Sequence, residues 1–194
     1  MRYGPEHKEA ARARILGAVG RGFRRLGYGG IGVDGLAKEA GVTSGAFYGH
    51  FESKAAAFEA AALAGLVELR EAIEGLRAQH GAAWLAKFVD FYLSTKRTCE
   101  LGESCALQSL TPEVARAGRD TRAAYEAELV RVIDAVAAGL PDAAPAARKK
   151  LAWAILAMLS GGVTLARASD DAKLGTQIAG ALKAAIAALV DRGA

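Results

Sequence analysis

Residues 33–54 read VDGLAKEAGVTSGAFYGHFESK and carry the strongest structural signal in the chain. They predict two short helices, 33–40 and 44–49, joined by a tight turn in which Gly41 supplies the backbone freedom. Thr43 is placed to cap the second short helix, and Ser53 is placed to cap a long helix over 54–79. The stretch therefore predicts a helix-turn-helix, whose second helix enters the major groove of DNA.

Apolar and polar residues separate along this stretch as a DNA-binding unit requires. The apolar positions are spaced to pack the small helices together: Val33, Leu36, Ala37, Ala40, Val42, Phe47 and Phe51. The N-terminal end of the second helix presents polar side chains and a small residue, and a lysine follows at the positive end of the next helix, within reach of a phosphate. The predicted DNA-contacting residues are Thr43, Ser44, Gly45, Tyr48, His50 and Lys54.

The excess positive charge of the chain lies in its first quarter. Residues 1–54 hold nine Lys or Arg and five Asp or Glu, whereas the other 140 residues hold 16 of each sign. A helix is predicted over 8–26, ended by Gly27, with its apolar stripe on one side and its arginines off that stripe. A basic module joined to a neutral body is typical of proteins that bind the phosphate backbone.

Residues 27–28 and 33–54, above all 41–51 followed by Ser53 and Lys54, resemble the DNA-binding domain of the TetR family of transcriptional repressors. The resemblance covers about residues 8–60. It implies that the side chains of Tyr48 and Lys54 touch phosphates. It also implies that Thr43, Ser44 and Gly45 lie against the groove.

Two positions depart from the pattern of that family. Relatives usually have Ser or Thr around Ile31 and Gly32, where a hydroxyl caps the first short helix, and glycine is a weaker cap. Gly35 replaces a residue that is usually charged, which costs about 1 kcal/mol of helix propensity relative to Ala. The phosphate contact of the missing hydroxyl is therefore not transferred to this chain.

The remainder of the chain also predicts helices. Hydrophobic residues make up 52% of the sequence, alanine above all, and only four residues are proline, so the composition favours helix. Helices are expected over 82–96, 112–139, 144–168 and 172–191, with an irregular segment over 97–111 that has room for one helical turn. No stretch shows sustained alternation of period two. The predicted fold is all-α, with a DNA-binding domain over 1–54 and an effector-binding and dimerisation domain over 55–194.

Apolar faces on the last two helices predict a homodimer. The faces include Leu151, Ile155 and Leu159 in one helix and Ile178, Leu182 and Ile186 in the other. The family resemblance implies a four-helix interface made by these helices. Two recognition helices related by a two-fold axis also match a palindromic operator.

The middle of the chain is predicted to hold a largely apolar effector pocket. Four large aromatic residues lie within nine positions of one helix, and two more lie on the helices 113–139 and 144–168, which we expect to bound the pocket. The candidate lining residues are Trp84, Phe88, Phe91, Tyr92, Tyr125 and Trp153. The predicted ligand is an apolar or aromatic small molecule.

Cys99 and Cys105 leave a second hypothesis open. Lys96 and Arg97 lie near them in the sequence and favour a thiolate, while Glu100 and Glu103 oppose it. A repressor that senses oxidants or electrophiles through either thiol is the alternative to small-molecule sensing. Inert buried thiols are the plainer interpretation.

Other classes of function lack positive support in the sequence. The three histidines are scattered, so we expect no metal site and no cofactor, and no nucleophile–base pattern indicates an enzyme. A helical enzyme or interaction module remains a third hypothesis, which predicts no salt-dependent affinity for DNA. The uncharged stretch 151–166 is shorter than the roughly 18 residues of a membrane span, so a buried helix is expected. Two cysteines and the absence of a secretory leader predict a cytoplasmic protein.

Overall fold

A computed structural model describes residues 5–141 and 144–193, and helices account for most of these residues, with no strand among them. The elements are α1 Pro5–Gly30, α2 Val33–Glu39, α3 Ser44–Tyr48, α4 Lys54–His80, the 3-10 turn η1 Gly81–Ala83, α5 Trp84–Thr98, the 3-10 turn η2 Leu101–Glu103, α6 Ala106–Val114, α7 Arg119–Ala137, α8 Pro145–Arg167 and α9 Ala172–Gly193.

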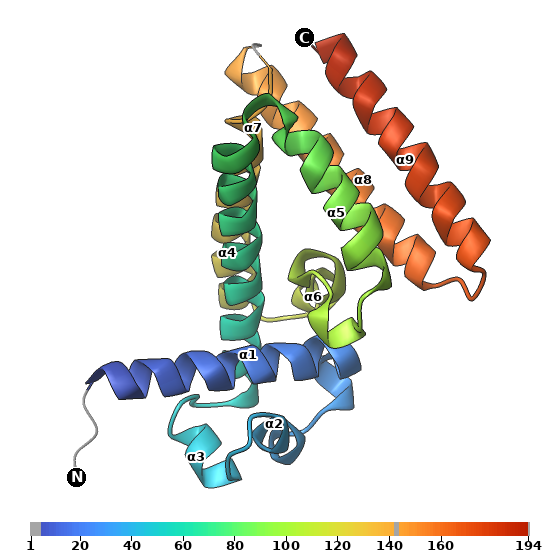
Figure 1. The fold of residues 1–194 in the computed structure, drawn as a ribbon. Helices are drawn as coiled ribbons and strands as arrows, with labels where there is room; N and C mark the ends of the chain where they lie inside the picture. The colour runs from blue at the N-terminus through green and yellow to red at the C-terminus, as the bar shows by residue number, and fades with distance from the viewer. Residues whose placement is uncertain (1–4, 142–143, 194) are drawn as a thin grey trace.

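Helices α1, α2 and α3 form one end of the molecule. Figure 1 shows α1 lying across the lower end of α4, with α2 and α3 beneath it. Buried apolar side chains from all of these helices join them, among them Phe23, Leu36, Phe47 and Phe58. The first helix was predicted to end at Gly27, and the structure has a kink there. Gly27 has the non-helical angles φ 73° and ψ 169°, and a short helical piece continues from it to Gly30.

The other helices surround the upper part of α4. Helix α7 packs along α4, and α8 packs against α5, α7 and α9. Their shared core includes Ile73, Phe88, Ile133, Ile155 and Leu159, each 1% exposed or less. By length and composition α8 and α9 could span a membrane. The buried face of α8 instead packs on its neighbours, as in a core helix.

The segment 97–111 is more regular than predicted. It holds η2 and most of α6, whose residues Ala106, Leu107, Leu110 and Val114 are buried along one face. The helix predicted over 112–139 is wrong at its start, because Pro112 lies in the last turns of α6 and α7 begins only at Arg119. Proline suits the first turn of a helix, so the sequence favours a helix that starts at Pro112. In the structure, packing of the apolar face of α6 places Pro112 near the end of that helix instead.

Candidate DNA-binding surface and effector cavity

The turn between α2 and α3 is built by backbone geometry. Gly41 has φ 65°, a left-handed conformation that favours glycine, and the N–H of Val42 donates to the carbonyl of Ala37 at 2.9 Å. The hydroxyl of Thr43 accepts from the N–H of Ala46 at 3.2 Å and caps α3, as predicted. Phe47 is fully buried and anchors α3 from below. The orientation of α3 is therefore determined at both its start and its inner face.

The six predicted DNA-contacting residues lie together at α3 and the start of α4. Thr43, Gly45 and Tyr48 are exposed, and the Tyr48 side chain is 55% exposed although its ring is large. His50 is half-buried. The hydroxyl of Ser44 donates to the Oδ1 of Asp34 at 2.5 Å and ties α3 to α2, a role that the sequence pattern did not indicate.

Lys54 is held at the first position of α4. The hydroxyl of Ser53 accepts from the N–H of Ala56 at 3.0 Å and caps the helix, as predicted. The Nζ of Lys54 lies 4.4 Å from the centroid of the Tyr28 ring, within the range of a cation–π contact. Tyr28 is thus a positioning residue for this cation. The sequence analysis did not identify this role, although residues 27–28 are part of the resemblance to the TetR family.

The two departures from the family pattern pack against each other. Gly32 provides no side-chain cap for α2, as expected. Ile31 is buried at 5% exposure, and a Cβ at Gly35 would lie 2.8 Å from its Cγ1. The glycine therefore accommodates the isoleucine, and its cost in helix propensity is offset by a buried apolar side chain.

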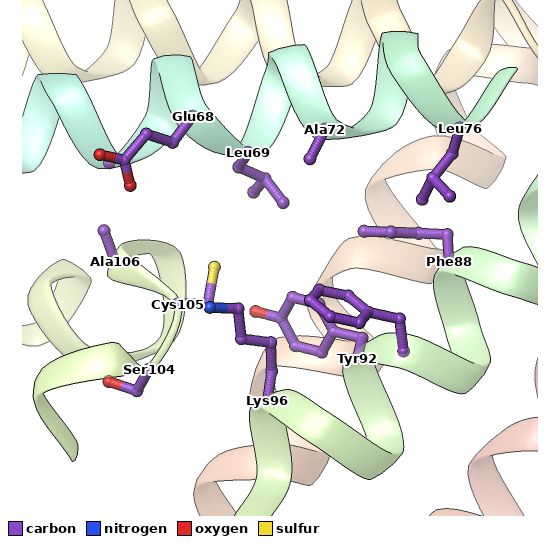
Figure 2. Close-up of a pocket in the computed structure, with 12 residues that line it drawn as sticks. Glu68, Leu69, Ala72, Leu76, Phe88, Tyr92, Lys96, Ser104, Cys105 and Ala106 are labelled. Carbon is purple, nitrogen blue, oxygen red and sulfur yellow. The ribbon is translucent and has the colours of Figure 1, made fainter. Parts of the chain in front are cut away.

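A cavity of about 350 Å³, open to solvent on one side, lies between α4, α5 and the chain entering α6. Figure 2 shows Leu69, Ala72 and Leu76 of α4 facing Phe88 and Tyr92 of α5. The complete lining is Gly65, Glu68, Leu69, Ala72, Leu76, Phe88, Phe91, Tyr92, Lys96, Ser104, Cys105 and Ala106. Its chemistry is mostly apolar, with a polar end at α6.

The polar end of the cavity brings Tyr92, Cys105 and Lys96 together (Figure 2). Burial raises the pKa of Tyr92 well above its ordinary value and also raises the pKa of the Cys105 thiol, so both groups are protonated at neutral pH. The Nζ of Lys96 donates to the carbonyl of Glu103 at 2.7 Å. Cys105, named in the sequence only for redox chemistry, is a wall of this cavity.

Three residues predicted to line the pocket lie elsewhere. Trp84 is buried and its Nε1 donates to the carbonyl of Gly139 at 2.8 Å. The hydroxyl of Tyr125 is paired with that of Thr111 at 2.6 Å, and burial raises the pKa of Tyr125 to about 12. Trp153 is 45% exposed on α8.

The helices 113–139 and 144–168, expected to bound the effector pocket, do not bound this cavity. Helix α4 faces the aromatic stripe of α5 at the cavity, and no residue of α7 or α8 lines it. Sequence periodicity shows that a stripe is apolar, but not which helix packs against it.

Cys99 lies outside this cavity, between α5 and α8. Its Sγ is 3.1 Å from the Nη2 of Arg167, which also donates to the carbonyls of Cys99 and Lys96. Both cysteines are free thiols. The sequence placed these two thiols in one segment, whereas the structure gives them separate surroundings.

Two contacts join η2 and α6, the elements on either side of the cavity residues 104–106, to α1. The Nε of Arg24 donates to the carbonyl of Gly102 in η2 at 2.7 Å. At the other end of α6, the N–H of Tyr28 donates to the Oε1 of Glu113 at 3.3 Å. Helix α6 thus begins at the cavity and is held to α1 near both of its ends.

The outer faces of α8 and α9 carry apolar stripes. On α8 the exposed positions follow a spacing of four residues: Trp153, Ala157, Gly161 and Leu165. On α9 the inward stripe contains Ala179, Leu182 and Ile186. Only 17% of the most apolar stretch of helix α9 is buried, so most of its other faces are exposed in the protomer. Leu182, expected to face a second subunit, packs inside the protomer, because a Cβ at Gly162 of α8 would overlap its side chain.

Among the described residues, no group of three or more His, Cys, Asp or Glu side chains could hold a metal ion.

Comparison with known proteins connects the N-terminal part to a defined family. The profile of the bacterial regulatory proteins of the tetR family matches residues 15–61. No protein of curated function matches the chain.

Solved structures with the same fold cover nearly the whole chain. A TetR-family transcriptional regulator from Streptomyces coelicolor superposes with a TM-score of 0.75 at 18% identity, over 95% of this chain and 96% of that one. A TetR-family regulator from Cytophaga hutchinsonii gives 0.73 at 18% identity, over 97% and 98%. Escherichia coli NemR in its reduced form gives 0.72 at 19% identity, over 90% and 95%. The predicted all-α fold, a helix-turn-helix domain followed by a helical domain, is confirmed.

Proposed function

We propose that this chain, whose N-terminal part matches the tetR family of regulators, is a dimeric repressor released from a palindromic operator by a small apolar compound. Binding to DNA, rather than catalysis, is the activity of this family and of the matched structures. The observation that carries the finer proposal is the cavity at the start of α6, because α6 is hydrogen-bonded through Glu113 to α1, the helix that supports the helix-turn-helix.

The DNA-binding face consists of exposed groups on a rigid support. Tyr48 and Thr43 project from a helix anchored by buried Phe47, and Lys54 stands at the positive end of α4. A phosphate bound there would gain from the helix terminus and from the lysine together. Tyr48 and Lys54 would therefore contact the backbone, while the N-terminal end of α3 would enter the major groove.

The partner subunit would cover the outer stripes of α8 and α9. Leu165 is 66% exposed, Trp153 is 45% exposed and Leu174 is 43% exposed, which leaves large apolar side chains on two adjacent helices. Large exposed apolar side chains on neighbouring helices are typical of an interface between subunits. A two-fold axis there would present two copies of α3 to successive major grooves.

Release would follow from a shift between two arrangements of α6. A ligand in the cavity would touch Cys105 and Ala106 at the start of α6. The η2 turn before α6 is tied to α1 through Gly102, and α6 itself is tied to α1 through Glu113. If the ligand fits better when α6 has moved, the two copies of α3 lose the spacing that the operator requires. A protein with this activity works in the cytoplasm, where its operator lies.

The proposal is tested by selecting operators from a random duplex library with the purified full-length chain. The expected product is a palindromic consensus bound by a dimer, with an affinity that falls steeply as the salt concentration rises. Selection of no consensus, or of a single half-site bound by a monomer, would refute it.

A thiol-based sensor is the second candidate function, because the guanidinium of Arg167 lies against the sulfur of Cys99. Cysteines that react with oxidants and electrophiles lie in partly exposed sites beside cationic groups, as the half-buried Cys99 does. Treatment of the operator complex with N-ethylmaleimide separates the two candidates. Release that disappears in Cys99→Ser favours the thiol sensor, and retention of the operator by the labelled wild type excludes it.

A further inference from the structure

The hydroxyl of Tyr92 is a buried polar group without a partner. Tyr92 is 1% exposed, and its hydroxyl makes no hydrogen bond to any described residue. Figure 2 shows it directed into the cavity, beside the thiol of Cys105. This thiol, a weak hydrogen-bonding group, adds to the effect of burial in raising the pKa of Tyr92, but it is no full partner for the hydroxyl. Buried hydroxyl groups are nearly always paired, since leaving one unpaired costs about 1–3 kcal/mol.

The protonation of this end of the cavity defines what it can bind. Because burial raises its pKa, Tyr92 keeps its proton and is able to donate. A thiol is a poor hydrogen-bonding group and does not satisfy the tyrosine. The cavity therefore offers a donor of fixed position at one end.

The rest of the lining argues for an uncharged ligand body. Its only charged side chains are Glu68 and Lys96, which are of opposite sign, and Lys96 already donates to a backbone carbonyl. Leucine, alanine and phenylalanine side chains make up the opposite end. A formal charge in this space would lose its hydration without a matching partner.

We propose that this cavity binds an uncharged apolar compound that carries a hydrogen-bond-accepting oxygen, such as an aryl ketone, and that Tyr92 donates to that oxygen. The inference rests on the proposed function, since it names the chemical class of the effector. The apolar body of the ligand lies between Leu76 and Phe88, and the oxygen lies at the α6 end, next to the segment that holds α1.

The test compares two probes of nearly equal shape. Equilibrium dialysis of the full-length protein with 2-acetylnaphthalene and with 2-ethylnaphthalene measures both dissociation constants. The wild type is expected to prefer the ketone by about three- to tenfold, as for one neutral hydrogen bond, and Tyr92→Phe is expected to remove that preference. Equal affinities in the wild type, an unchanged preference in Tyr92→Phe, or no binding of either probe overturns the proposal.

Stability measurements separate a ligand-binding hydroxyl from a structural one. Tyr92→Phe removes an unpaired hydroxyl, so its melting temperature without probe is expected to equal or exceed that of the wild type. Tyr125→Phe is the matched control, because it loses the 2.6 Å contact with Thr111 outside the cavity. This control is expected to melt earlier and to keep the preference for the ketone. A lower melting temperature of Tyr92→Phe would assign the hydroxyl a structural role and overturn the proposal.

The same samples distinguish this inference from the proposed function. Operator release is followed separately, by fluorescence anisotropy of labelled operator. Binding of the ketone that depends on Tyr92 but leaves the operator bound would support the ligand class and refute release through this cavity. Operator release by other compounds, without preferential binding of the ketone, would support the proposed function and refute the ligand class.

Discussion

The Nε of Arg24 donates a 2.7 Å hydrogen bond to the carbonyl oxygen of Gly102, across 78 positions of sequence. Arg24 belongs to the helix that supports the DNA-binding face, and Gly102 precedes the residues that line the cavity. The contact lies where three helices meet, because a Cβ at Gly65 of α4 would overlap the Cβ of Ala106 of α6 and would lie 3.8 Å from the Nη1 of Arg24 of α1. If α6 moves, as proposed, this contact is one route by which α1 would respond.

Arg24→Met is expected to weaken this connection while the methionine retains much of the apolar stem. The free energy of unfolding should fall by about 1–2 kcal/mol, as for a lost hydrogen bond from a charged donor. The ratio of 2-acetylnaphthalene affinities for the free protein and the operator complex should fall towards one, since binding coupling is reciprocal. Arg14→Met, on an exposed site of the same helix, is the control that should keep the wild-type ratio.

Lys54→Ala is expected to weaken binding to every DNA sequence by the same factor. A single lost phosphate contact should lower the slope of log affinity against log salt by about 0.9. Anisotropy titrations at several salt concentrations measure the slope. Lys149→Ala, at the far end of the molecule on α8, should leave it unchanged. Discrimination lost at one base pair only would contradict a phosphate contact.

Gly35→Ala is expected to destabilise the protein although alanine is the better helix former. The new Cβ would meet the buried Cγ1 of Ile31 at 2.8 Å, and overpacking of this kind costs about 1–3 kcal/mol. Gly75→Ala is the matched control, because nothing lies within 4 Å of a Cβ there and helix propensity alone should add up to about 1 kcal/mol. Urea unfolding of both variants gives the comparison, and stabilisation of Gly35→Ala would contradict the packing argument.

Leu165→Glu is expected to produce monomers that no longer bind the operator. The residue is 66% exposed in the protomer, so the charge should disturb the subunit interface and leave the core intact. Val130→Glu introduces the same charge at an exposed apolar residue of α7 and should remain dimeric. Sedimentation velocity at micromolar concentration measures the states. A dimer of Leu165→Glu would place the interface elsewhere.

Glu128 is expected to make stability depend on pH in the acid range. Burial alone raises the pKa of this carboxyl, but hydrogen bonds from Arg131 and Arg70 outweigh burial and lower it. A lowered folded-state pKa means that the stabilisation is present above the unfolded-state pKa of about 4.3 and is lost as the pH falls through the folded-state value. Glu128→Gln should therefore lower stability at pH 7 by about 1–3 kcal/mol and show a smaller further loss on acidification.

The control for this dependence is Glu126→Gln, at an exposed position on the same helix. Chemical denaturation at pH 7 and at pH 3.5 should show the wild-type difference in the control. If Glu128→Gln shows the same difference in unfolding free energy between pH 7 and pH 3.5 as the wild type, the carboxyl of Glu128 does not contribute to the loss of stability in acid.

Much of the fold could be predicted because the deciding signals are local. A cap such as Thr43 or Ser53 acts on a backbone N–H three residues away, and the turn at Gly41 depends on one residue's dihedral angles. The starts of α2, α3 and α4 were therefore predicted to the residue. The start of α7 was not, because residues 112–119 lack a strong cap and tertiary packing decides where α6 ends.

The sequence by itself determined the helix-turn-helix, the apolar faces of α5, α8 and α9, and the family, since each depends on residues close together in the chain. Only the tertiary structure decided which faces meet. It paired the aromatic stripe of α5 with α4, turned Leu182 inwards and left Leu165 outside. It also placed the unpaired hydroxyl of Tyr92 beside Cys105. Apolar burial is not directional, so a stripe of hydrophobic residues specifies that it will be covered but not by which helix.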